Sequence, residues 1–107
     1  MPVLSYMQEQ YTKDISTTEV AGMMAMSVPH FCRLFKKTVG CSFHEYLRSI
    51  RIAEAIKLLI TTDNNISQIA SKVGYDNPGC FIRVFRKQTG LPPLQYKNSQ
   101  IFSPPHY

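Results

Sequence analysis

The sequence predicts an all-α fold in which two helix-turn-helix units of the homeodomain-like kind are joined by one long helix. An internal repeat, helical spacing of the apolar residues and the lack of strand-like alternation predict this fold class. The repeat pairs residues 31–46 (FCRLFKKTVGCSFHEY) with residues 81–96 (FIRVFRKQTGLPPLQY) at an offset of 50. Its identical positions are Phe31, Arg33, Phe35, Lys37, Gly40 and Tyr46, which recur as Phe81, Arg83, Phe85, Lys87, Gly90 and Tyr96.

Each copy of the repeat predicts a helix with an apolar back and a basic front, ended by its glycine. The apolar backs consist of Phe31, Leu34 and Phe35, and of Phe81, Val84 and Phe85. The basic fronts consist of Arg33, Lys36, Lys37, Arg83, Arg86 and Lys87, half of the 12 Lys and Arg residues. A solvated helix face would explain one basic pair equally well. The duplication and the net charge of +5 favour a nucleic-acid partner instead.

The other elements of the first unit follow from apolar spacing and capping residues. Residues 3–12 place apolar side chains at helical spacing and predict an opening helix. Ser16 or Thr17 is expected to cap the next helix. Ser27 is expected to cap the basic helix, whose first turn tolerates Pro29 because proline loses no hydrogen bond there. A short helix, a tight turn and a basic helix make a helix-turn-helix.

The long helix is predicted over residues 43–61, with Ser42 as its cap. Its length of roughly 28 Å is enough to space two units along DNA. We expect one apolar stripe formed by Phe43, Tyr46, Leu47, Ile50, Ala53, Ile56, Leu59 and Ile60. The basic residues Arg48, Arg51 and Lys57 are expected on other faces of this helix.

The second unit repeats the first with a longer turn. Ser67 is expected to cap its leading helix and Gly74 to end it, at an offset of 49 from the first unit. The turn at residues 75–78 is therefore one residue longer, and a short helix opens at Pro93. The expected domains are the N-terminal unit, linker helix, C-terminal unit and a tail with little order: residues 1–42, 43–61, 62–98 and 99–107.

Composition excludes several other classes. The three cysteines form neither a disulfide framework nor a CxxC pair, so free thiols in a reducing cytoplasm are expected. There is no apolar run of membrane-spanning length and no secretory signal. The three histidines lack a matched acid, nucleophile or metal-ligand spacing, and no glycine-rich phosphate loop occurs. We therefore expect a soluble intracellular protein with no catalytic site, metal or other cofactor.

The second unit contains the most specific motif of the chain. Residues 66–96, ISQIASKVGYDNPGCFIRVFRKQTGLPPLQY, resemble the signature of the DNA-binding module in the AraC/XylS family of bacterial transcription regulators. The matching parts are IxxIAxxVGY, FxRxFRK and GxxPxxY, and the resemblance extends over about residues 4–96. It implies that both basic helices enter successive major-groove segments on one face of a duplex, about 34 Å apart. If the linker helix holds the units closer than that, the DNA is expected to bend.

The resemblance also implies which residues contact DNA. The family's base-reading positions correspond here to Pro29, Cys32, Arg33, Pro78, Gly79, Ile82 and Arg83, and His30 is near the groove edge. Arg33 and Arg83 suit base contact because a guanidinium pairs bidentately with guanine. Phosphate binding or an intrahelical salt bridge is their alternative role. Phosphate contacts are expected from Lys36, Lys37, Arg86, Lys87 and, at helix N-termini, Ser16, Thr17 and Ser67.

Four of these positions depart from the polar residues that usually read bases. Pro29, Cys32, Gly79 and Ile82 form few hydrogen bonds through their side chains. We therefore expect the second unit to contribute backbone affinity and shape readout more than base recognition, with Ile82 able to touch a thymine methyl.

Other interpretations of the sequence remain open at this point. A helical interaction module could dock acidic partners or RNA polymerase without specific DNA binding, and anionic membrane binding is a weaker alternative. In the family, such a module is often joined to a sensing or dimerisation domain, for which this chain has no room. We expect a fragment of a longer regulator rather than a stand-alone regulator controlled by its abundance.

Overall fold

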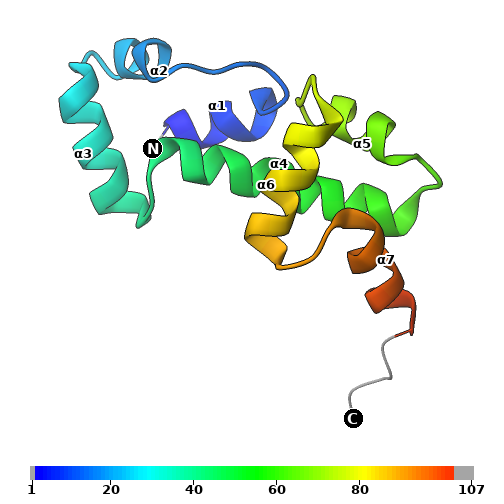
Figure 1. Ribbon diagram of the computed structural model, residues 1–107. Helices are drawn as coiled ribbons and strands as arrows, with labels where there is room; N and C mark the ends of the chain where they lie inside the picture. The colour runs from blue at the N-terminus through cyan, green and yellow to red at the C-terminus, as the bar shows by residue number, and fades with distance from the viewer. Residues whose placement is uncertain (1, 103–107) are drawn as a thin grey trace. The chain divides into compact units, whose positions relative to one another are not determined.

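The computed structural model describes residues 2–102 and shows, within that range, only helices and their connections (Figure 1). The helices are α1 (Pro2–Gln10), α2 (Thr17–Met23), α3 (Val28–Val39), α4 (Phe43–Thr61), α5 (Ile66–Lys72), α6 (Pro78–Thr89) and α7 (Pro93–Phe102). The predicted all-α class is confirmed. The chain divides into two compact units, Met1–Arg51 and Ile52–Tyr107. The helix α4 therefore contributes its first half to one unit and its second half to the other.

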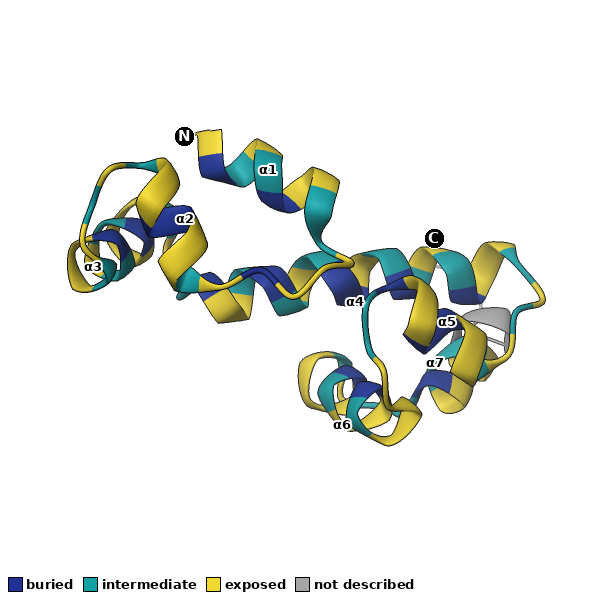
Figure 2. Cartoon of the chain, turned by 90° about the horizontal axis from the view of Figure 1, so that it is seen from above, coloured by how far each residue is buried: buried dark blue, intermediate teal, exposed yellow. Residues whose placement is uncertain are grey.

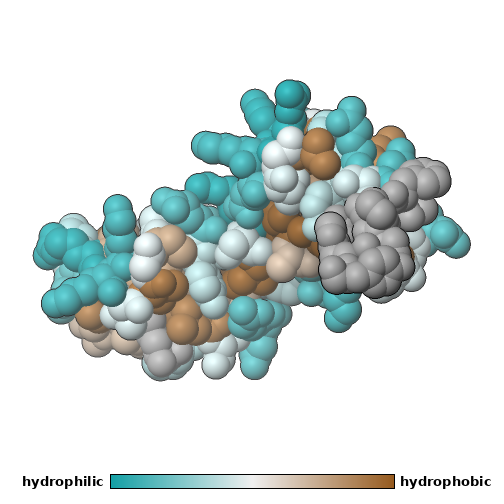
Figure 3. Space-filling model, turned by 90° about the horizontal axis from the view of Figure 1, so that it is seen from below, coloured by the Kyte–Doolittle hydropathy of each residue, from teal (hydrophilic) through white to brown (hydrophobic). Residues whose placement is uncertain are grey.

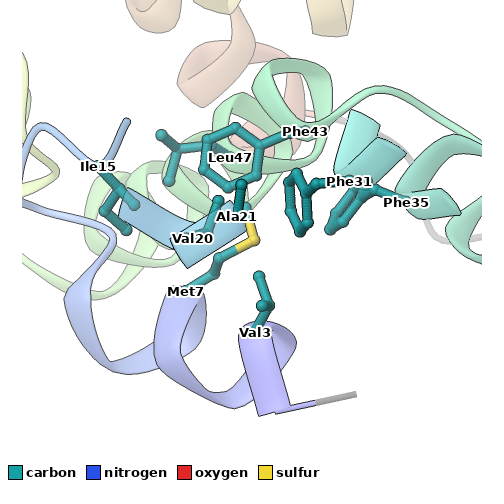
Figure 4. Close-up of a cluster of buried hydrophobic side chains, with 9 residues drawn as sticks. All are labelled: Val3, Met7, Ile15, Val20, Ala21, Phe31, Phe35, Phe43 and Leu47. Carbon is teal, nitrogen blue, oxygen red and sulfur yellow. The ribbon is translucent and has the colours of Figure 1, made fainter. Parts of the chain in front are cut away.

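The first unit encloses one apolar core, which Figure 4 shows in close-up. Val3 and Met7 of α1 point into this core and are fully buried. The other buried members are Ile15, Val20, Ala21, Phe31, Phe35, Phe43 and Leu47. The ring centroid of Phe35 lies 5.8 Å from those of Phe43 and Tyr46, in the edge-to-face geometry that aromatic pairs prefer. Burial of Phe35 and of Phe43 stabilises the unit by about 1.5–3 kcal/mol each.

The second unit reproduces this packing with the residues of the second repeat. Phe81 and Phe85 are fully buried, with ring centroids 5.7 Å apart, the same separation as between Phe31 and Phe35. Phe85 also meets Tyr96 edge to face at 5.4 Å, as Phe35 meets Tyr46. Among the described residues of this unit, Ile52, Ala55, Leu59, Ile69, Ala70, Val73 and Pro93 are also buried. The duplication in sequence is therefore a duplication of a packing arrangement.

The turns between the paired helices share one hydrogen-bond pattern. The amide of Met26 donates to the carbonyl of Ala21 at 2.9 Å, and the amide of Tyr75 donates to that of Ala70 at 2.8 Å. These bonds belong to Schellman motifs, which require a left-handed residue just after the helix. Gly74 fills that position in the second unit with φ of 101°, whereas the first unit places Ala25 there at φ of 53°.

The predicted extra residue in the second turn is confirmed by the caps. Three residues separate the C-cap Met24 from the start of α3 at Val28, and four separate the C-cap Val73 from Pro78. Asp76 is the additional residue, immediately before the N-cap Asn77. The second unit thus reaches its basic helix through a longer connection.

The apolar stripe predicted for α4 is only partly correct. Ala53 and Ile60 are exposed, and Ile52 and Ala55 are buried in their place. The reason is that the two halves of α4 complete different cores. The prediction of one stripe over the whole helix assumes that the helix packs against a single core. The prediction is therefore wrong where the helix leaves the first unit.

Arg51 also departs from its expected place on an outer face of α4. It is only 9% exposed, and its Nε donates to the carbonyl of Tyr11 at 2.7 Å. Its Nη2 donates to the carbonyl of Lys13 at 2.9 Å. Both acceptors lie just after α1, where backbone carbonyls lack helical partners. Arg51 therefore attaches the connection between α1 and α2 to α4.

Two predicted boundaries are corrected as well. The N-cap of α5 is Asn65 and not Ser67: Asn65 accepts from the amide of Gln68 at 2.8 Å, and the Gln68 side chain accepts from the Asn65 amide at 2.9 Å. This reciprocal capping box explains why the helix begins one residue before Ser67. At the other end, α7 continues to Phe102 because no proline or glycine follows Pro93 until residue 104, so residues 99–102 are helical. The rest of the expected tail, residues 103–107, lies outside the described residues.

The left-handed Ala25 predicts an unusual response to glycine. Ala25→Gly should raise the free energy of unfolding by about 0.5–1 kcal/mol, because relief of the left-handed strain exceeds the added entropy of the unfolded chain. Urea denaturation would measure the change. The matched control is Ala53→Gly, an exposed helix-interior site, which should lower stability by about 1 kcal/mol. Equal losses in both variants would contradict a strained turn.

The buried Arg51 predicts a large loss of stability on truncation. Arg51→Ala should lower the free energy of unfolding by about 2–3 kcal/mol, since hydrogen bonds from a charged donor to two carbonyls are lost. Lys57→Ala removes an exposed cationic side chain from the same helix and should change stability by less than about 0.5 kcal/mol. Similar small effects in both variants would show that the Arg51 bonds do not stabilise the unit.

Candidate nucleic-acid interface

Caps and core residues fix the position of α3 within the first unit. The hydroxyl of Ser27 accepts from the amide of His30 at 3.3 Å, so the predicted N-cap is confirmed. The helix ends at Gly40, which is left-handed at φ of 98° and whose amide donates to the carbonyl of Lys36 at 2.9 Å. Phe31 and Phe35 are 0% exposed on the inner side. With both rings buried, the helix has one orientation available, and its polar residues face outward.

The outward side of α3 is basic and has no negative charge of its own. Pro29, His30, Arg33, Lys36 and Lys37 are all exposed, and the helix contains no acidic residue. An intrahelical salt bridge, the alternative role for Arg33, is therefore impossible. Lys36 and Lys37 also stabilise the helix C-terminus through its dipole, by about 0.3–1 kcal/mol each. That structural role is compatible with contact to a phosphate.

One residue predicted for this side lies at its margin. Cys32 is half-buried and packs against the core of the first unit. Its place in the helix, one position after the buried Phe31, brings it to the margin between core and solvent. Of the predicted base-contact residues in α3, Cys32 is thus the least accessible.

The helix α6 presents a corresponding front in the second unit. Its N-cap Asn77 accepts from the amides of Gly79 at 2.7 Å and Cys80 at 3.3 Å. A Cβ at residue 79 would lie 3.1 Å from the Asn77 side-chain oxygen, so glycine leaves room for this cap. The exposed side chains of the front are Pro78, Ile82, Arg83, Arg86 and Lys87, with the exposed Gly79 among them. This helix also has no acidic residue.

Figure 2 shows the same division in both helices, with buried positions on one side of α3 and of α6 and exposed positions on the other. Each helix carries three cations on its exposed side, at equivalent positions of the repeat. Guanidinium groups suit guanine edges and phosphates, and lysine ammonium groups suit phosphates. Both basic fronts therefore suit the binding of a polyanion.

The N-termini of the leading helices differ between the units. Ser16 caps α2 by accepting from the amide of Glu19 at 3.1 Å, and the half-buried Thr17 follows it. The Glu19 carboxylate accepts a hydrogen bond from the hydroxyl of Tyr6, and this bond raises the pKa of Tyr6. In α5 the neutral Gln68 stands at the position equivalent to Glu19, next to the exposed Ser67. A carboxylate repels phosphate, so the entrance of α5 suits phosphate better than that of α2. The sequence shows this Glu-to-Gln difference once the units are aligned at an offset of 49.

Other kinds of site find little support in the described part of the chain. Within residues 2–102, no group of three or more His, Cys, Asp or Glu side chains is placed to hold a metal ion. None of the described helices has the length and apolar character that crossing a lipid bilayer requires. Cys32, Cys41 and Cys80 are free thiols, each half-buried.

Paired short helices, a buried aromatic back and an acid-free basic front define a DNA-binding helix-turn-helix protein of the transcription-regulating class. Comparison with known proteins assigns the family. A family model described as a helix-turn-helix domain, of the AraC type, matches residues 20–99. The chain belongs to the AraC/XylS family of helix-turn-helix regulators, and the resemblance seen in the sequence is confirmed.

Individual relatives are regulators. The chain is 36% identical over 95 residues to the lactose operon transcription activator of Staphylococcus xylosus, covering 89% of this chain and 34% of that protein. It is 33% identical over 95 residues to the bifunctional transcriptional activator and DNA repair enzyme AdaA of Bacillus subtilis, covering 89% of this chain and 45% of that one. The chain therefore spans less than half the length of these two curated relatives.

Solved structures share the fold closely. The C-terminal domain of AraT, a response regulator from Geobacillus stearothermophilus, superposes with a TM-score of 0.85 at 31% identity, covering 96% of this chain and 88% of that one. The DNA-binding domain of AdpA, determined in complex with a target DNA, has the same fold with a TM-score of 0.87 at 24% identity, covering 98% of this chain and 96% of that one.

Proposed function

We propose that this chain binds an asymmetric double-stranded DNA site by placing α3 and α6 in successive segments of the major groove. The duplicated basic front supports this proposal. Both helices expose three cations and contain no acidic residue, and each helix is held by its own pair of buried phenylalanine rings. The proposed parts are two reading units, residues 1–42 and 62–98, joined by the helix at 43–61. Grooves on one face of DNA recur every ~34 Å, so the joined units read two parts of one site.

Within this proposal, Arg33 and Arg83 are the main base-contacting residues. Both are exposed, and guanidinium groups pair bidentately with the O6 and N7 atoms of guanine. Around them, base edges are expected to meet Pro29, His30, Pro78, Gly79 and Ile82. Cys32 remains a candidate base contact at the edge of the groove, where its half-buried side chain leaves only part of its surface available.

Phosphate contacts are assigned to the remaining cations of the two fronts and to the leading helices. Lys36, Lys37, Arg86 and Lys87 are exposed and follow the base-contacting residues toward the C-terminus of each helix. Ser16, Thr17 and Ser67 are the proposed contacts at helix starts. Of these, Ser67 is favoured, because α2 carries the carboxylate of Glu19 in its first turn and the first turn of α5 has no acidic residue.

For the whole protein, the proposal includes a domain and a partner beyond this chain. Since relatives that are transcription activators are two to three times longer, we propose that an effector-binding or dimerisation domain accompanies this module and that RNA polymerase is a further partner. The module is proposed to act without cofactor and without enzymatic activity, in the bacterial cytoplasm on nucleoid DNA. Docking to acidic proteins through the basic fronts, without specific DNA binding, is the competing outcome.

Selection from a random pool of double-stranded DNA tests the proposal directly. We expect a two-part motif covering about two helical turns, with affinity that falls steeply as salt concentration rises. A motif that covers a single half-site would mean that one unit only anchors the protein. If no sequence is enriched while acidic proteins are bound, specific DNA binding would be the wrong proposal.

Two variants of α3 separate base contact from phosphate contact. Arg33→Ala should weaken binding of the selected site by about 1–3 kcal/mol and relax base preference in the part of the site read by the first unit. Lys37→Ala, its matched control, should weaken all DNA to a similar degree and reduce the salt slope by about one. Binding titrations at several salt concentrations, with site variants, measure both effects. Unchanged base preference in Arg33→Ala would remove this residue from the base contacts.

A further inference from the structure

The structure exposes a large apolar side chain on a surface that is otherwise basic. Among the described residues, the exposed large hydrophobic side chains are Met23, Ile60, Ile82 and Leu94. Figure 3 shows exposed hydrophobic residues set among hydrophilic ones on one face of the molecule. Of the four, Ile82 alone belongs to a basic helix, α6, and it is 37% exposed there. The other three lie outside α3 and α6.

The neighbours of Ile82 on the helix surface leave its side chain accessible from the front. Residues three and four apart are adjacent on a helix, so Pro78 and Gly79 precede it and Arg86 follows it. Gly79 has no side chain to cover it, and Arg83 is the next residue along the chain. Ile82 is thus an apolar surface between a compact ring and guanidinium groups. A polyanion bound by those groups would lie beside it.

The chemistry of the major groove offers one apolar partner for such a side chain. Base edges there present hydrogen-bond donors and acceptors, and the C5-methyl group of thymine is the apolar exception. Isoleucine has no polar atom with which to satisfy a donor or acceptor, so pairing with any other edge leaves that edge desolvated without a partner. Its branched Cβ also restricts the side chain to one main rotamer in a helix, which lowers the entropy lost on contact.

The first unit lacks this feature. Cys32 stands at the equivalent position of α3, half-buried against its own core. The difference between Ile82 and Cys32 therefore distinguishes the two proposed reading units.

We infer that Ile82 recognises the C5-methyl group of a pyrimidine in the part of the site read by α6. This inference rests on the proposed function and specifies the ligand feature at that site. Because isoleucine contacts the methyl group and ignores the hydrogen-bonding edge, 5-methylcytosine satisfies it as thymine does. Cytosine does not, since it lacks the methyl group. DNA binding by this chain is then sensitive to cytosine methylation at that base pair.

A methyl-deletion scan of the selected site tests the inference. Each thymine is replaced in turn by deoxyuridine, which keeps the base-pairing edge and removes only the methyl group. The wild-type chain should lose affinity about fourfold at one thymine in the part of the site read by α6, the effect of one buried methyl-sized group. Ile82→Ala should bind thymine and uracil equally at that position. The matched variant Ile60→Ala removes the same kind of side chain from an exposed position outside α3 and α6, and it should keep the wild-type sensitivity there.

The converse experiment adds the methyl group to a different base. The same position is changed to a C·G pair, and that cytosine is then methylated at C5. Methylation should raise the affinity of the wild-type chain about fourfold and should not change the affinity of Ile82→Ala. Ile82→Val, which keeps the branched Cβ, should show an intermediate gain, and circular dichroism confirms that both variants remain helical.

The outcomes separate this inference from the function on which it rests. Specific binding with a flat uracil scan, or equal uracil sensitivity in wild type and Ile82→Ala, would overturn methyl recognition and leave the two-groove proposal standing. Failure to select any DNA sequence would overturn both.

Discussion

The burial of two phenylalanine rings on each basic helix is the constraint on which the rest of the structure depends. Phe31 and Phe35 in α3, and Phe81 and Phe85 in α6, are completely enclosed by their own units. Two rings one turn apart define a line along the helix, so each helix cannot rotate without exposing one of them. The opposite side, with its cations, is therefore presented to solvent in a fixed register. The direction in which the cations point is a direct result of core packing.

Around that constraint, the chain positions its connections with backbone hydrogen bonds and one buried cation. Both turns use the same Schellman pattern, although Ala25 adopts it with more strain than Gly74. Arg51 serves the first unit from within, since its guanidinium satisfies carbonyls that follow α1. A positive charge in this chain is thus not always a surface charge. Its location decides whether it binds a ligand or completes the fold.

Much of the architecture could be predicted from sequence because its signals are local or repeated. The serine caps, the glycine helix ends and the aromatic spacing all act within a few residues, and the repeat supplies each signal twice. The role of Arg51 could not be predicted, because it depends on contacts 38 and 40 residues away in the sequence. The stripe on α4 failed for a related reason, as the helix serves two cores. For the site, sequence identified the exposed cations, but the partial burial of Cys32 required the packed structure.

The two units have different residues at equivalent positions, and this affects the direction in which the chain would bind along DNA. Glu19 faces Gln68 in the alignment of the units, and Cys32 faces Ile82. Two identical units in series would recognise the same half-site twice, so a placement shifted by one unit would still match part of the site. Unlike units penalise that placement. In the proposed binding mode, the protein would therefore have a preferred direction along the duplex, and a segment attached to either of its ends would lie on a defined side of the site.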